Sequence, residues 1–338
     1  MRFFIKLLIV FFLIFNLQIF AESSNTGTTT ANFLMIGAGA NALSLGGAYT
    51  SLSDNVEGLY WNPGAIAKAE RSQAEFYSAN WLVGTKYSWI GLLLKVTPAD
   101  AIGLSFTNLN YGEEDVNSVT EPYGTGEKWS ASDIAFGVSY GRSLTDRFSI
   151  GGTFKYINQR IWHSSSSGFA FDVGLLFITQ FNDMRISMSI ANFGSDMFFD
   201  GKDLYKTIDI DPNHTGNNEA IVSKLKVDKW PIPLVFRTGI LVNLYKDKFS
   251  DIDLLVDAVR PNNNTEYINM GLKYNFKQFI HLNVGYSSLF KKDAQEGLTF
   301  GFGLNYSIAG LGIIEAQYGV QTMDLFDNIH SFSISFKF

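Results

Sequence analysis

Charged residues at polar positions of alternating segments are the side chains of this sequence best placed to do chemistry. These candidates are Lys155, Asp172, Asp253, Asp257 and Lys273. Each stands between two apolar residues, so all five are expected to point away from the apolar face of their segment. Charges at such positions can neutralise one another, hold a neighbouring segment, or line a path for a solute.

Lys155 and Asp172 are predicted to lie on neighbouring strands, where they could form a pair. An unpaired charge in a narrow, partly dry interior is costly, so most such charges are expected to be neutralised by one another. We favour a structural role, in which these charges brace the wall and the segment it encloses. A transport path remains the alternative.

Catalysis and metal binding find little support in the sequence. The four histidines, His163, His214, His281 and His330, are scattered without metal-ligand spacing, and no serine has a convincing partner. Cysteine is absent, which excludes disulfides, thiolate metal sites and cysteine nucleophiles. We therefore predict no catalytic residue, no metal site, no cofactor and no enzymatic activity.

From about Gln73 onward, apolar and polar residues alternate in short segments separated by turns, the pattern of strands with two different faces. In the last segment Phe332, Ile334, Phe336 and Phe338 share one face, and three serines and a lysine share the other. The segments lie near 73–82, 86–97, 101–111, 128–143, 147–162, 167–180, 184–193, 233–244, 249–259, 265–275, 279–287, 296–308, 312–321 and 329–338. The sequence therefore predicts an all-β fold of fourteen antiparallel strands.

The connections between these segments sort by parity. Those after even-numbered segments are tight, such as 277–278 and 309–310, whereas most of the others are longer, up to 112–127 and 194–232. The connection 83–85 is a short exception. Transmembrane β-barrels have short periplasmic turns and longer outer loops, so the pattern predicts such a barrel over residues 71–338 with both ends at the periplasm.

A soluble β-sandwich would also alternate, but two features favour the barrel. Aromatic residues make up 15% of the chain. Five tryptophans near segment ends, Trp81, Trp89, Trp129, Trp162 and Trp230, match the interfacial girdles of outer-membrane barrels. The polar faces are rich in Gly, Ser, Thr and Asn rather than Lys and Glu, which suits a crowded lumen.

Residues 1–21 have the pattern of a cleaved signal peptide. Arg2 and Lys6 precede an apolar run at 7–15, and Ala21 suits the last position before the cut. An uncleaved anchor is the alternative, although the run is short against the roughly 20 residues of a spanning helix. Removing these two cations from 26 Lys+Arg leaves 24 against 32 Asp+Glu, a net charge of −8, which argues against a nucleic-acid partner.

Residues 22–70 form an N-terminal segment, of which 33–70 do not alternate and are rich in small residues. Its glycines permit sharp bends and close backbone approach, and Asp54 or Ser53 could cap a short helix through about Tyr60. This compact unit needs a surface to pack against, and the barrel lumen is the available space. The residues expected to shape the resulting hatch, or plug, are Gly46, Gly47, Asp54, Trp61, Asn62 and Pro63.

The stretches 45–49 (Leu-Gly-Gly-Ala-Tyr) and 59–63 (Leu-Tyr-Trp-Asn-Pro) resemble the N-terminal region of the PorV/PorQ family, part of the broader FadL-like barrels. The similarity continues at 154–157, 169–174, 190–194 and 231–233. Two positions depart: 64–66 read Gly-Ala-Ile where the family usually has Ala-Gly-Leu, and Asn41 stands where arginine is common. The resemblance implies a fourteen-stranded transmembrane barrel with an N-terminal hatch.

The C-terminal Phe338 ends an alternating strand and resembles the signal read by the barrel assembly machinery. Together with the signal peptide it predicts the outer membrane of a Gram-negative-type bacterium, with outer-membrane lipid and that machinery as partners. No nucleic acid is expected.

Two functions follow from the resemblance. A PorV/PorQ-like protein would be a component or docking partner of a type IX secretion system and would bind secretion-machinery or secreted proteins. A FadL-like channel would instead take up hydrophobic small molecules. The loop 194–232 is polar apart from the cluster Met197-Phe198-Phe199, which favours the secretion role.

Overall fold

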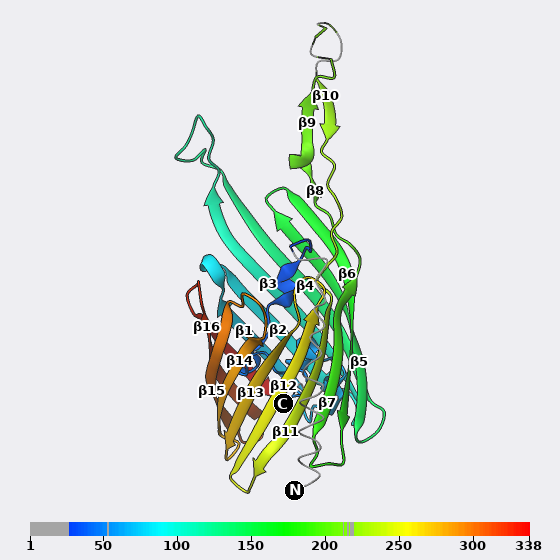
Figure 1. The fold of residues 1–338 in the computed structure, drawn as a ribbon, viewed down its shortest axis with the longest axis vertical. Coiled ribbons are helices and arrows are strands. Elements are labelled where there is room, and N and C mark those ends of the chain that lie inside the picture. Colours follow the sequence, from blue (N-terminus) through cyan, green and yellow to red (C-terminus); the bar gives the residue numbers. More distant parts are fainter. Residues whose placement is uncertain (1–26, 53, 212, 215, 217–219) are drawn as a thin grey trace.

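The computed structural model describes residues 27–338 except 53, 212, 215 and 217–219. The predicted signal peptide, residues 1–21, lies outside these described residues. Fourteen long antiparallel strands dominate the fold (Figure 1). They are β1 Gln73–Asn80, β2 Lys86–Lys95, β3 Asp100–Asp115, β4 Lys128–Ser143, β5 Phe148–Ile161, β6 Ser164–Ile178, β7 Arg185–Gly194, β11 Val235–Lys246, β12 Ser250–Pro261, β13 Tyr267–Phe276, β14 Ile280–Leu289, β15 Glu296–Ile308, β16 Gly312–Met323 and β17 Ile329–Lys337.

The strands close into a barrel because the first pairs with the last. β1 is hydrogen-bonded to β17 from Gln73 opposite Lys337 to Asn80 opposite His330. The remaining neighbours pair in sequence order, with β7 meeting β11 across the longest connection. The all-β, fourteen-stranded barrel predicted from alternation is confirmed, and β3 and β6 are longer than the predicted segments.

The outward face of the wall is apolar. Phe76, Ile90, Phe106 and Phe136 lie opposite one another on β1 to β4 and are 39–49% exposed. A continuous row of large apolar side chains on the outside of a closed sheet is the surface that a membrane barrel presents to lipid. Among the described residues no helix is long and apolar enough to cross a membrane.

The connection between β7 and β11 stands out from the barrel. It contains β8 Asp200–Gly201, η4 Lys202–Leu204, and a separate two-stranded hairpin, β9 Tyr205–Ile208 with β10 Ile221–Lys224. The hairpin projects well beyond the strand ends (Figure 1). β3 to β6 also extend further on this side than β1 and β2, which are joined by the short η3 Leu82–Gly84.

The N-terminal segment folds into the lumen as four short helices: η1 Asn32–Met35, α2 Ala40–Ser44, α3 Gly58–Trp61 and η2 Ala65–Lys68. Its side chains and the inward side chains of the wall form one buried apolar cluster. Gly46 adopts a φ of +69°, and a Cβ at this position would lie 2.7 Å from the backbone of Tyr286 on β14. Hatch and wall therefore touch backbone to backbone, which only glycine permits here.

Two expectations were wrong in detail. Trp89 is 1% exposed and points into the lumen, and Trp81 and Trp129 line an internal cavity, so none of these three belongs to an interfacial girdle. The hatch supplies an apolar surface inside the barrel, so β2 carries large apolar side chains on both faces. Asp54 does not cap a helix, because α3 begins at Gly58 without a side-chain cap; Asp54 pairs instead with Arg185, with 2.6 Å between Oδ2 and Nη1.

Candidate ligand cavity and hatch contacts

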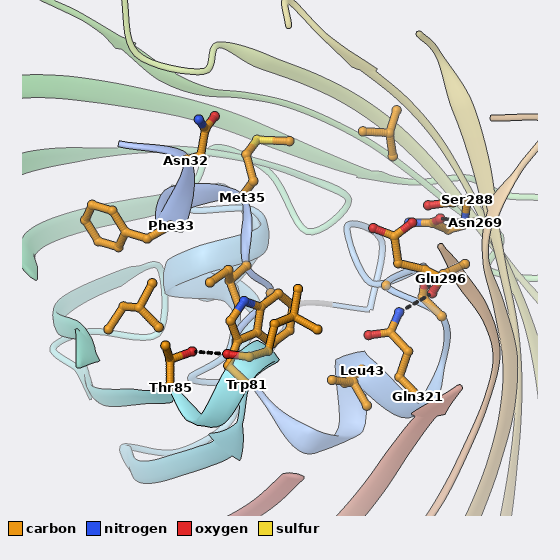
Figure 2. A pocket seen from close by; sticks show the side chains of 18 of the residues that line it. Asn32, Phe33, Met35, Leu43, Trp81, Thr85, Asn269, Ser288, Glu296 and Gln321 are labelled. Atoms are coloured by element: carbon orange, nitrogen blue, oxygen red, sulfur yellow. Dashed lines mark hydrogen bonds between the residues drawn. The ribbon is translucent and has the colours of Figure 1, made fainter. Parts of the chain in front are cut away.

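A cavity of about 780 Å³ lies between the hatch and the wall, at the end of the barrel that carries the long connections (Figure 2). Its hatch side is formed by η1, by the bend at Gly46 and Gly47, and by Trp61. Its wall side comes from the ends of several strands and from the β1–β2 connection. The apolar and aromatic lining residues are Phe33, Met35, Ile36, Leu43, Trp61, Trp81, Leu82, Val83, Leu109, Tyr111, Trp129, Val259 and Tyr267.

The polar side chains of the lining are Asn32, Thr85, Glu114, Arg237, Asn269, Ser287, Ser288, Glu296 and Gln321. Gln321 donates a hydrogen bond of 3.1 Å to Ser287, shown as a dashed line in Figure 2. Glu296 is held by Lys291, with 3.1 Å between Oε2 and Nζ. A mostly apolar pocket with a few fixed polar groups is the usual form of a small-molecule site.

Arg237 on β11 is the buried charge of the lining. It is 4% exposed, and its guanidinium lies 5.4 Å from the ring centre of Trp61 and 5.8 Å from that of Tyr60. These rings are fixed by the hatch backbone: Tyr60 Oη donates to Leu34 O at 2.9 Å and Trp61 Nε1 donates to Ala38 O at 2.8 Å. Burial raises the pKa of Tyr60 to about 12, so its hydroxyl remains a neutral donor.

At the opposite end the hatch rests on the tight turns. Lys68 Nζ donates to the carbonyls of Thr145 and Asp146 at 3.0 and 2.9 Å. Lys95 Nζ donates to Ala67 O. The helix η2 also packs on β3 to β6. The cavity is therefore accessible from the side of the long connections and is floored by the hatch.

Asp257 on β12 joins the wall to the hatch through three hydrogen bonds. Its Oδ2 accepts hydrogen bonds from Tyr49 N at 3.0 Å, Thr50 N at 2.8 Å and Thr50 Oγ1 at 2.6 Å. Asn62 makes a second contact, because its Nδ2 donates both to Thr50 O within the hatch and to Leu175 O on β6, each at 3.0 Å. Pro63 lies close against Gly151 on β5: a Cβ added to Gly151 would be 2.2 Å from the carbonyl oxygen of Pro63.

The five predicted lumen charges separate into two groups. Lys155 and Asp172 form a buried ion pair of 2.6 Å, as expected from their strands. Asn192 completes this group: its backbone N–H donates to Asp172 at 2.7 Å and its side-chain Oδ1 accepts from Lys155 at 2.7 Å. Asn192 occupies an irregular point in the β6–β7 pairing, with a φ of +63°.

The second group is Asp253, Asp257 and Lys273 on β12 and β13. Asp253 accepts a 2.8 Å hydrogen bond from Asn243. Lys273 lies directly opposite Asp253 in the β12–β13 register, but no ion pair joins them in the described part of the chain. For this second group, sequence reasoning predicted the inward positions but not the partners of the side chains.

Several inward charges were missed, notably Arg237, Glu57, Glu75 and Glu315. Arg237, Glu75 and Glu315 stand at the polar register of their strands, and the same alternation that identified Lys155 could have identified them. Glu57 lies in the hatch, whose sequence does not alternate, so no pattern could predict which way its side chain points. Burial raises the pKa of Glu57 to about 7.

No protein-family model and no curated protein matches the sequence. Solved structures do match. The monoaromatic hydrocarbon channel CymD aligns with a TM-score of 0.60 at 9% identity, covering 89% of this chain and 98% of that one. The Ralstonia pickettii toluene transporter TbuX gives 0.55 at 10% identity over 89% and 98%. A Pseudomonas aeruginosa FadL homologue gives 0.53 at 10% identity over 92% and 98%. The chain therefore shares its overall fold with these three proteins.

Proposed function

We propose that this protein is an outer-membrane channel that admits small hydrophobic molecules from outside the cell. The observation that carries the proposal is the cavity of about 780 Å³ lined by aromatic and aliphatic side chains. Such a volume accommodates a compact organic molecule, and burying apolar surface there supplies about 25 cal/mol per Å².

The fold supports the same role, since CymD is described as a monoaromatic hydrocarbon channel and TbuX and TodX as toluene transporters. The identity to each is about a tenth, so the choice of solute rests on the residues of this chain. Because the hatch floors the cavity, passage requires a rearrangement of the hatch or of the wall beside it. The lumen charges Lys155, Asp172, Asp253, Asp257 and Lys273 serve chiefly to brace these parts.

The proposed location is the outer membrane of a Gram-negative-type bacterium. Residues 1–21 would direct export as a signal peptide and then be cleaved. The apolar outer row supports contact with lipid. Phe338 follows β17 and donates its backbone N–H to Ser72 O at 2.9 Å, at the closing seam of the barrel. This position suits a residue that the assembly machinery reads while the last strand is placed.

Filling the cavity tests the channel function. Val259 points into the cavity from β12, and Ala258 beside it points outward. Cells that export Val259→Trp should take up radiolabelled toluene several-fold more slowly than wild-type cells, while Ala258→Trp should match wild type. Equal folded amounts of each barrel in the membrane must be shown. Wild-type uptake no faster than in cells lacking the protein would end the channel proposal.

A protein-secretion role is the second candidate, and one observation favours it. The β9–β10 hairpin projects far beyond the barrel and is mostly exposed, including the apolar side chains of Ile208 and Val222, which suits contact with another protein (Figure 1). Photo-crosslinkers at Lys206 and Ser223 in the native host would test it. Capture of secretion-machinery or secreted proteins, absent when the crosslinker is at the Gly310 turn, would favour a PorV/PorQ-like function over uptake.

A further inference from the structure

The guanidinium of Arg237 is incompletely satisfied inside the cavity. Its Nη1 is buried and has no hydrogen-bond partner in the described part of the chain. No ion pair joins Arg237 to any described carboxylate. A buried, unsatisfied donor on a charged group costs more than about 1–3 kcal/mol, so an acceptor supplied from the cavity would be strongly favoured.

Tyr60 interacts with Arg237 through a side-chain hydrogen bond, but no group in the described part of the chain supplies an acceptor to Nη1. Asp257 interacts electrostatically with Arg237, yet its Oδ2 is committed to Tyr49 and Thr50 and its Oδ1 makes no hydrogen bond. The other two charged side chains of the lining are Glu296, which Lys291 neutralises, and Glu114, which is exposed. Among the described residues Arg237 is therefore the one cation of the lining, and Asp257 is close enough to interact with its charge.

The aromatic residues of the lining favour a solute that carries an aromatic ring. Phe33, Trp61, Trp81, Trp129 and Tyr267 all face the cavity. Aromatic pairs in offset or edge-to-face contact gain about 0.5–1.5 kcal/mol beyond the area that they bury. Arg237 lies over the faces of Tyr60 and Trp61, so an acceptor that binds its guanidinium brings the attached group against the same rings.

We propose that the solute of this cavity is a small aromatic carboxylate, bound with its carboxylate on the guanidinium of Arg237 and its ring among the aromatic lining residues. This inference rests on the proposed channel function and specifies its substrate class. A carboxylate is preferred to a neutral acceptor because its hydrogen bonds to guanidinium are charge-assisted and roughly twice as strong. A cationic solute is disfavoured because it would meet the like charge of the buried guanidinium.

The test compares benzoate with toluene, which share the ring and differ in the carboxylate. Binding to the purified, detergent-solubilised barrel is measured by calorimetry. Wild type should bind benzoate at least tenfold more tightly than toluene. Arg237→Met should abolish that preference and leave toluene binding within twofold, and Arg237→Lys should retain part of it. Arg260→Met removes an exposed arginine from β12 and should bind both probes like wild type.

The alternative outcomes are separable. Toluene bound as tightly as benzoate by wild type, or benzoate binding unaffected in Arg237→Met, would refute the carboxylate site and leave the channel function standing. If neither probe binds to wild type, the cavity is not a site for such molecules, and both proposals fail. Octanoate tests the ring: affinity equal to that of benzoate would refute the aromatic part. The wild-type comparison stands even if Arg237→Met does not fold.

Discussion

One oxygen of Asp257 and one residue of the hatch, Thr50, are joined by two hydrogen bonds: Thr50 N lies 2.8 Å and Thr50 Oγ1 2.6 Å from Oδ2. Asp257 is fully buried, so these bonds replace the hydration that its carboxylate loses on folding. The contact joins residues that are 207 positions apart. It couples the position of the hatch to that of strand β12.

Asp257→Ala should loosen the hatch. The substitution leaves the buried donors of Tyr49 and Thr50 without an acceptor, at a cost of about 1–3 kcal/mol for each unsatisfied group. We expect a lower thermal midpoint for the folded barrel and greater permeability of the cell to large antibiotics. Asp253→Ala is the control, because Asp253 contacts the wall residue Asn243 and not the hatch. Equal permeability of the two variants would contradict the anchoring role.

The Lys155–Asp172 pair should show strong coupling. Lys155→Met leaves a buried carboxylate without its cation and should cost about 3–5 kcal/mol in denaturant unfolding. Asp172→Asn alone likewise leaves the buried Lys155 without its negatively charged partner. The double variant should recover much of the loss, since the amide oxygen introduced at position 172 can still accept from the Asn192 backbone N–H. Strictly additive effects in this double-mutant cycle would show that the pair contributes no coupling.

Stability should fall as the pH rises from about 5 to 8 because of Glu57. Burial raises its pKa in the folded state from 4.5 to about 7, and the charge of Glu315 adds to the shift, whereas Tyr49, Lys273 and Lys337 oppose it. Between these pH values the folded protein holds a proton that the unfolded chain has released, so the free energy of unfolding decreases with pH. Glu57→Gln should flatten this dependence by roughly 1.4 kcal/mol per pKa unit.

Thermal midpoints at pH 5 and pH 8 measure the effect. Glu70→Gln is the control, because Glu70 is exposed and directly follows the hatch. The same slope in wild type and Glu57→Gln would assign the pH dependence to other groups.

Gly46→Ala should destabilise the folded protein more than the positive φ of this residue alone explains. Gly46 and Gly310 have φ values of +69° and +77°, so both variants lose about 1–2 kcal/mol when alanine is introduced. Only at Gly46 does the added Cβ meet a backbone, that of Tyr286 at 2.7 Å, whereas nothing lies within 4 Å at Gly310. The difference between the two thermal midpoints isolates the cost of the hatch–wall approach. Similar losses would show that the hatch yields at this point.

Much of the barrel follows from local pattern. A strand places alternate residues on opposite faces, so alternation determined the number of strands, their approximate bounds and which residues share a face. It also placed Lys155 and Asp172 inward on neighbouring strands, and the parity of the connections indicated which end carries the long loops. These features depend on residues near one another in the chain.

The contacts that build the cavity depend on residues far apart, and only the tertiary structure decided them. Nothing in the local pattern distinguishes Trp89, which the hatch buries, from the partly exposed Trp162. Nor could it show that Asp257 meets Thr50, or that Arg237 faces the cavity with one nitrogen unpaired. The physical reason is that the hatch has no repeating period. Its place is set by close backbone approach and by single hydrogen bonds across the lumen, which exist only once the wall has closed around it.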